Sequence, residues 1–70
     1  MQRTEQNHDY ALGLLAGVQL ARHDLTLNEE SVGIEANESY ERAISILVVE
    51  REQFVLGFRD GYSGWREGIV

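Results

Sequence analysis

The residues that most often carry out catalysis are sparse in this chain. His8 and His23 are its only histidines, and neither belongs to an HExxH or ExxH metal-ligand pattern. The sequence has no lysine, so a phosphate-binding glycine loop that ends in lysine cannot form. Its serines lack the context of a hydrolase nucleophile, and adjacent carboxylates such as Glu29 and Glu30 are typical of surface charge. We therefore predict that the protein is not an enzyme.

An acidic segment near the middle of the chain has the outline of a calcium-binding loop. Oxygen-bearing side chains occupy positions one, three, five, seven and twelve of a twelve-residue window, namely Asp24, Thr26, Asn28, Glu30 and Glu35. Position six is Glu29, however, where an EF-hand loop requires glycine for its sharp turn, and position eight is Ser31 instead of an apolar residue. We predict neither a metal nor a cofactor.

The C-terminal part of the chain concentrates aromatic and guanidinium groups. Side chains of these types often dominate the binding energy at protein interfaces, and they can also stack on a nucleobase or hold its phosphate. The candidate binding residues are Arg59, Tyr62, Trp65 and Arg66. A structural alternative is that Phe58, Tyr62 and Trp65 continue the apolar stripe of a helix and close the core.

The net charge of −6 is confined to one segment. Residues 24–41 contain six acids and no basic residue, whereas the rest of the chain has six acids and six arginines, which cancel. A concentrated negative field speeds encounter with a basic surface. We predict that Glu29, Glu30 and Glu35 contact such a surface on a larger protein partner, with an ordinary solvated loop as the alternative.

Two stretches with helical spacing must position these groups. The first is predicted from about residue 9 to 23, with Asn7 or Asp9 as a cap, and the second from about residue 37 to 60, with Asn37 as its N-cap. The β-branched residues of 44–49 leave a strand as an alternative there. Length favours the helix, because strands usually have about five or six residues.

These elements predict an all-α fold, in which an antiparallel two-helix hairpin is joined by an acidic connector over residues 24–36. The Thr26-x-x-Glu29 spacing of a capping box permits a short extra helix in the connector. An extended conformation around Gly33 is the alternative. Residues 61–70 form an aromatic and arginine-containing tail, and the whole chain of 1–70 is expected to be one domain.

The second predicted helix has more apolar surface than one partner helix covers. A helix that is apolar most of the way round is normally buried on most sides. We therefore predict a homo-oligomer, unless a short element from residues 25–34 folds over the spare face. The predicted oligomer interface comprises Ile46, Val49, Arg51, Leu56, Gly13 and Gly17. Arg51 either forms an ion pair between subunits or lies along the core margin.

Two pairs of glycines four residues apart, Gly13/Gly17 and Gly57/Gly61, lie in the helical stretches. Interior glycine costs a helix roughly 1 kcal/mol relative to alanine. Such pairs allow two helices to approach closely. For the second pair, the alternative is a weakened helix that ends at Gly61.

The composition narrows the function classes further. A chain of 70 residues without cysteine cannot use disulfides to supplement a small core. Its acidity argues against direct binding to nucleic acid or to a membrane surface, and no targeting segment is evident, so a cytoplasmic location is expected. We predict an inhibitor or adaptor of a larger protein, a type common among small regulators of phages and mobile elements. The alternatives are an oligomer that sequesters an anionic ligand such as a nucleotide, and a structural subunit.

Overall fold

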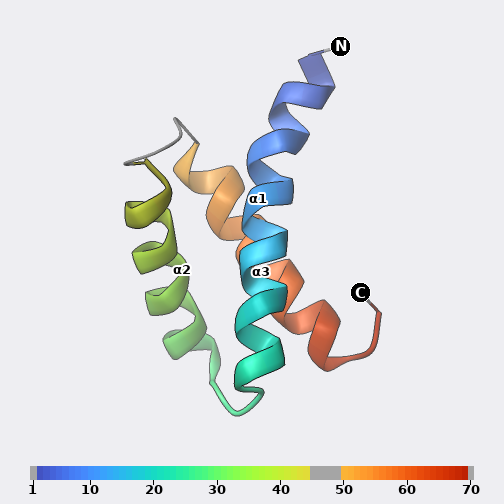
Figure 1. Cartoon of the computed structure of the whole chain (residues 1–70), viewed down its shortest axis with the longest axis vertical. Helices are drawn as coiled ribbons and strands as arrows, with labels where there is room; N and C mark the ends of the chain where they lie inside the picture. The colour runs from blue at the N-terminus through green and yellow to red at the C-terminus, as the bar shows by residue number, and fades with distance from the viewer. Residues whose placement is uncertain (1, 45–49, 70) are drawn as a thin grey trace.

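Three helices make up the part of the chain that the computed structural model describes, residues 2–44 and 50–69 (Figure 1). Helix α1 spans Gln2–His23, α2 spans Glu29–Ile44 and α3 spans Arg51–Arg66. The all-α prediction is confirmed, with no strand among the described residues. The predicted two-helix hairpin is wrong, because most of the acidic connector folds as α2.

Helix α2 begins earlier than predicted because Asn28 is its N-cap. The Asn28 Oδ1 atom accepts the Ser31 backbone N–H at 2.8 Å, so one of the unpaired donors of the first turn is satisfied. Asn37, the predicted cap, lies within α2, where its side-chain amide donates to the Gly33 carbonyl oxygen at 3.1 Å. The first turn also carries Glu29 and Glu30, whose charge suits the positive end of a helix.

The predicted long helix over residues 37–60 is two helices. Glu50 is extended, with φ −77° and ψ 123°, and α3 begins at the next residue. The strand alternative was predicted for residues 44–49, of which 45–49 lie outside the described residues and Ile44 is the last residue of α2. At its other end, α3 continues past Gly61 and ends at Arg66, and Gly68, which follows the C-cap residue Glu67, has a φ of 78°.

Helix α1 is longer than predicted, and the expected caps lie inside it. Asp9 has a different partner: its Oδ2 atom accepts the backbone N–H of Glu50 at 2.8 Å. Glu50 immediately precedes α3, whose N-terminal N–H groups carry partial positive charge. The Asp9 carboxylate therefore stabilises the N-terminus of α3 by accepting this hydrogen bond and by its negative charge.

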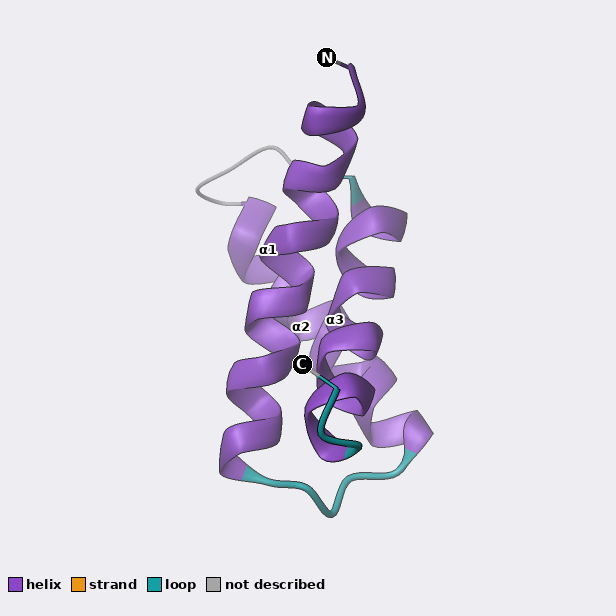
Figure 2. Ribbon diagram, turned by 90° about the vertical axis from the view of Figure 1, so that its right-hand side faces the viewer, coloured by secondary structure: helices purple, strands orange, loops and turns teal. Residues whose placement is uncertain are grey.

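Helices α1 and α3 run in the same direction, and α2 runs opposite to both. Asp9 of α1 meets the start of α3, whereas the Tyr62 hydroxyl, near the end of α3, donates to the carbonyl of Asp24, just after α1. Figure 2 shows α1 and α3 side by side. Parallel helices require a long connection, which α2 supplies.

The contact between α1 and α3 is made by backbone on backbone. A β-carbon at Gly13 or Gly17 would overlap the carbonyl oxygen of Phe54 or Phe58. The relation is reciprocal, since β-carbons at Gly57 and Gly61 would overlap carbonyl oxygens of α1, those of Tyr10 and Leu14. In this arrangement glycine Cα–H groups face carbonyl oxygens, as in weak hydrogen bonds between closely packed helices. Both glycine pairs thus act as packing surfaces within one chain.

Helix α2 is attached by side chains instead. The buried apolar residues come mainly from α2 and α3, and they are Ala21, Val32, Ala36, Phe54, Phe58 and Tyr62. Tyr40 of α2 lies with its ring centroid 6.2 Å from that of Phe54. Helices α1 and α2 both pack on α3 but have little contact with each other. A groove lies between them.

Candidate binding surfaces

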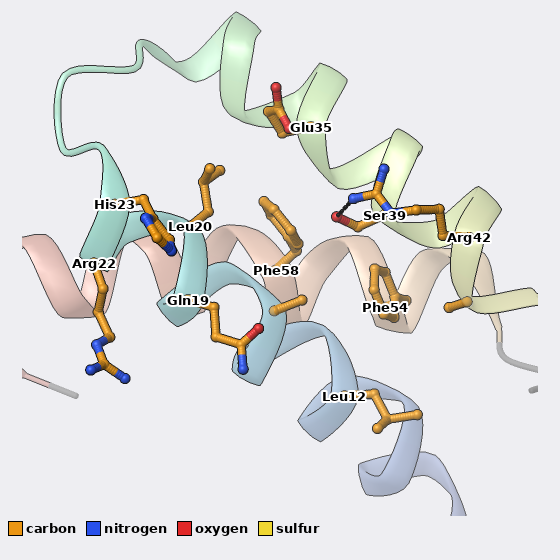
Figure 3. A pocket seen from close by; sticks show the side chains of 12 residues that line it. Leu12, Gln19, Leu20, Arg22, His23, Glu35, Ser39, Arg42, Phe54 and Phe58 are labelled. Atoms are coloured by element: carbon orange, nitrogen blue, oxygen red, sulfur yellow. Dashed lines mark hydrogen bonds between the residues drawn. The ribbon is translucent and has the colours of Figure 1, made fainter.

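The groove between α1 and α2 has an apolar floor and a polar rim. Its volume is about 900 Å³. Phe54 and Phe58 of α3 line its bottom, and Figure 3 shows both rings pointing from α3 into the space between the other two helices. Leu12, Ala16 and Leu20 line the α1 side, and Ala43 lines the α2 side.

Polar and charged side chains of both signs lie at the rim of the groove. Among the described residues, the charged or titratable groups in its lining are Arg22, His23, Glu35 and Arg42. The Arg22 side chain points away from the groove (Figure 3), and its guanidinium lies beside the Trp65 ring. The Arg42 guanidinium donates to the Ser39 hydroxyl at 3.3 Å (Figure 3). Two of the six arginines of an acidic chain thus border one apolar groove.

The outer side of α2 is acidic and exposed. Three or four residues separate successive members of one stripe, so their side chains share a face of the helix. We name this the acidic face of α2, and it consists of Glu30, Ile34, Glu38 and Glu41. Ile34 is 54% exposed at its centre. Of the other predicted partner-binding acids, Glu29 is exposed in the first turn and Glu35 is half-buried in the groove lining.

The structure divides the predicted aromatic and arginine cluster between two sides of α3. Arg59, Tyr62 and Arg66 line a small pocket of about 80 Å³ beside the start of α2. Trp65 lies instead beside α1, where the Arg22 guanidinium carbon is 5.8 Å from its ring centroid. The four predicted residues therefore do not form one site.

Tyr62 is a core residue that holds the loop between α1 and α2. It is 2% exposed, and its hydroxyl donates to the Asp24 carbonyl at 2.8 Å while accepting the Leu27 N–H at 3.0 Å. The Arg66 guanidinium carbon lies 5.8 Å from its ring centroid. The alternative that the C-terminal aromatic residues close the core therefore holds for Phe58 and Tyr62, which are buried. It does not hold for Trp65, which is 38% exposed.

The predicted oligomer-interface residues are dispersed. Gly13 and Gly17 are buried against α3 of the same chain. Arg51 is exposed and donates to the Asn37 side-chain oxygen at 2.5 Å, and Leu56 is 49% exposed on α3. Ile46 and Val49 lie outside the described residues. Association with a second copy stays a prediction.

Several polar contacts were not foreseen from the sequence. The Tyr10 hydroxyl donates to Asp60 at 2.5 Å across the α1–α3 contact. This hydrogen bond raises the pKa of Tyr10 above its ordinary value, with burial and the charge of Asp60 adding to the effect. After α1, Asp24 accepts both the hydroxyl and the N–H of Thr26, and these bonds lower the pKa of Asp24.

Comparison of the chain with protein-family models, curated proteins and solved structures gave no match. Within residues 2–44 and 50–69, histidine and acidic side chains form no cluster of three or more that could hold a metal ion. No helix in that part of the chain has both the length and the apolar character needed to cross a membrane.

Proposed function

We propose that the protein is a non-enzymatic binding protein whose acidic face of α2 docks against a basic surface of a larger protein, as an inhibitor or adaptor. One observation carries this proposal: the acidic segment is organised as an exposed face of a helix instead of a loose connector. An ordered helix presents its carboxylates at fixed spacing, so less conformational entropy is lost on binding.

The composition of this face suits an interface of moderate strength. Ile34 supplies an apolar centre, and Glu30, Glu38 and Glu41 surround it. Exposed carboxylates around an apolar centre raise the association rate and select against acidic partners, while the apolar group adds affinity. Such binding weakens as salt screens the charges.

The test compares two neutralised baits with the unmodified protein. Glu30→Gln, Glu38→Gln and Glu41→Gln together remove the charge of the acidic face. The matched control combines Glu50→Gln, Glu52→Gln and Glu67→Gln, three exposed acids at or near α3. A partner that is retained in stoichiometric amount from the native cell lysate is then purified and titrated against all three proteins.

We expect the control to bind like the unmodified protein and the acidic-face variant to bind at least about tenfold more weakly, with a smaller salt dependence. If the partner binds the two variants with equal affinity, the acidic face of α2 is not part of the interface. Absence of any stoichiometric protein partner would contradict the function itself.

The pocket beside α2 favours a second candidate function, binding of a small anion such as the phosphate of a nucleotide. Arg59 and Arg66 line it together with Asn28 and Ser63, and about 80 Å³ accommodates a phosphate group but not a base. Glu29 also lines the pocket and opposes an anion. This candidate is therefore the weaker one.

Calorimetric titration with ATP, AMP and inorganic phosphate tests the pocket. Binding that is lost in the double variant Arg59→Gln/Arg66→Gln, but kept in Arg51→Gln, would support it. The absence of heat with all three ligands would eliminate it.

A further inference from the structure

Three arginines form a row on α3 along its boundary with α2. The Arg51 guanidinium donates to the Asn37 side-chain oxygen at 2.5 Å. Arg59 lies over Gly33, where one of its guanidinium nitrogens would be 3.0 Å from an added β-carbon. Arg66 lines the small pocket beside the start of α2. We name these three residues the arginine row of α3, and it follows α2 from the start of that helix to its second half.

The positive charge of the arginine row is not paired with acids. The partner of Arg51 is a neutral amide, and Arg66 lies beside the face of the Tyr62 ring. Among the residues that the structure describes, no carboxylate forms an ion pair with an arginine of the row. All three side chains are exposed. The row is therefore available to an acidic surface from outside the chain.

The acidic face of α2 lies next to the arginine row. The row covers Gly33 and Asn37 of α2. These residues are three or four positions from Glu30 and Glu41, so they are neighbours of the acidic face on the helix surface. A strip of negative charge and a strip of positive charge thus run side by side along α2.

We propose that these two strips bind a second copy of the chain, with the acidic face of each copy on the arginine row of the other. Charge complementarity selects this occupant, because the chain itself supplies both the negative and the positive strip. A two-fold axis parallel to α2 exchanges the strips, so each negative strip meets a positive one. Every contact then occurs twice, and the assembly closes as a dimer.

The same axis determines which side chains meet, because rotation about it leaves every residue at its own height along α2. Glu41 is one helical turn from the residue to which Arg51 is bonded, so it reaches Arg51 of the second copy. Ile34 is next to Gly33 in the chain and meets the aliphatic part of Arg59 of the second copy. Since Ile34 is 54% exposed, this contact covers the apolar centre of the acidic face.

The dimer does not rest on the larger partner proposed above. Both complexes use the acidic face of α2, so they exclude each other. The dimer therefore lowers the amount of protein available to the partner as the concentration of the chain rises.

Charge reversal at one contact, followed by mixing, tests the dimer. Arg51→Glu places an acid in the arginine row, and Glu41→Arg places a basic side chain on the acidic face. Each homodimer then has like charges at both copies of this contact. In a mixed dimer, one contact is unmodified and the other has both charges reversed, so opposite charges meet at both. The controls are Arg22→Glu and Glu67→Arg, which make the same charge changes at exposed residues outside the two strips.

Sedimentation velocity from low to high micromolar concentration measures the dimer dissociation constant, and circular dichroism checks that each variant is helical. We expect the unmodified protein and both controls to reach twice the monomer mass of 8.0 kDa. Arg51→Glu and Glu41→Arg should each weaken the dimer at least about tenfold, and their equimolar mixture should recover it.

A monomeric unmodified protein overturns the dimer but leaves the capture of a larger partner unaffected. A mixture that associates no better than either variant alone also overturns it. If Arg51→Glu loses its helical signal, Arg59→Glu mixed with Glu30→Arg repeats the test nearer the start of α2.

Salt dependence separates this surface from the apolar groove between α1 and α2. A dimer that is held by two strips of opposite charge weakens as salt screens those charges. An association through the groove buries mainly apolar surface, which added salt does not weaken. Raising the sodium chloride concentration from about 0.05 to about 0.5 M should therefore raise the dissociation constant severalfold. A constant that stays the same or falls overturns the docking of the two strips.

Discussion

Helix α3 is held in two different ways on its two sides. Toward α1 it presents Gly57 and Gly61 to Gly13 and Gly17, and the two backbones touch. Toward α2 it presents Phe54, Phe58 and Tyr62, and side chains fill the space. The glycine contact has no room for adjustment, whereas the aromatic contact tolerates small shifts and leaves a groove beside it. We therefore expect the α1–α3 pair to be the more rigid part of the fold, whereas the candidate binding surfaces lie on α2 and in the groove beside it.

Alanine at the glycine contact should have the largest effect. A methyl group at Gly13 or Gly57 would overlap a backbone carbonyl, which only separation of the helices can relieve. We expect either substitution to lower the free energy of unfolding by about 2–3 kcal/mol or more, in spite of alanine's better helix propensity. Urea unfolding followed by circular dichroism measures this change. A loss below about 0.5 kcal/mol would show that the backbones do not touch.

The next largest effect is expected at Tyr62, on the other side of α3. Tyr62→Phe keeps the buried ring but removes the hydroxyl that bonds the Asp24 carbonyl and the Leu27 N–H. We expect a loss of about 1–3 kcal/mol, because two partly buried backbone groups lose their partner. Amide hydrogen exchange should quicken at Leu27 first. Unchanged exchange there would mean that the loop is held by other contacts.

Alanine at Gly33 in α2 should stabilise the protein, whereas alanine at the glycines between α1 and α3 should destabilise it. A β-carbon there would meet only the end of the Arg59 side chain, at 3.0 Å, and that flexible side chain can move. Gly33→Ala should therefore raise the free energy of unfolding by about 0.5–1 kcal/mol. The same urea measurement checks it. If Gly33→Ala destabilises the protein as much as Gly13→Ala does, then α2 packs on α3 as tightly as α1 does, which would contradict the difference between the two contacts.

The smallest effect concerns the Tyr10–Asp60 hydrogen bond at the edge of the glycine contact. The folded state raises the pKa of Tyr10, so the neutral hydroxyl is favoured. Its contribution is complete below the ordinary tyrosine pKa of about 10 and is lost as the pH rises through the higher folded value. We expect Tyr10→Phe to cost about 0.5 kcal/mol at neutral pH.

Spectrophotometric titration of the tyrosines, compared with that of Tyr10→Phe, identifies the group. The Tyr10 phenol should ionise above its ordinary pKa in the unmodified protein, and this transition should be missing from the variant. A Tyr10 that ionises at the ordinary value would mean that the hydrogen bond to Asp60 does not persist in solution.

Local patterns in the sequence were enough to predict the helical class and to show that the glycine pairs could allow two helices to pack closely. They did not show which helices meet, since Gly13 and Gly17 were assigned to an oligomer interface and pack against α3 of the same chain. Helical spacing identifies most of α1, and the predicted range of 37–60 contains the second half of α2 and the first part of α3. Glycines four residues apart share a face in any helix. Helix α2 was mistaken for a connector because its buried side is made of small or single apolar residues, Val32, Gly33 and Ala36. Such a short stripe gives a weak periodic signal.

The candidate site was less predictable, because it depends on which elements are neighbours. Arg22 and Arg42 are twenty residues apart in the sequence and lie in different helices, yet both border one groove. Trp65 and Arg66 are the reverse case, because they are adjacent in the sequence but lie on different sides of α3. Trp65 faces α1, and Arg66 faces the α2 side. Proximity in sequence therefore suggested a cluster that helical geometry divides.

The sequence by itself determined that the chain is helical, that its net charge lies in one segment, and that glycine rows allow two helices to touch, because propensity, charge and spacing are local properties. The tertiary structure decided which helices meet. It placed the acids on a separate helix, buried Tyr62 and left a groove beside that helix, because a small core can cover only one side of α2.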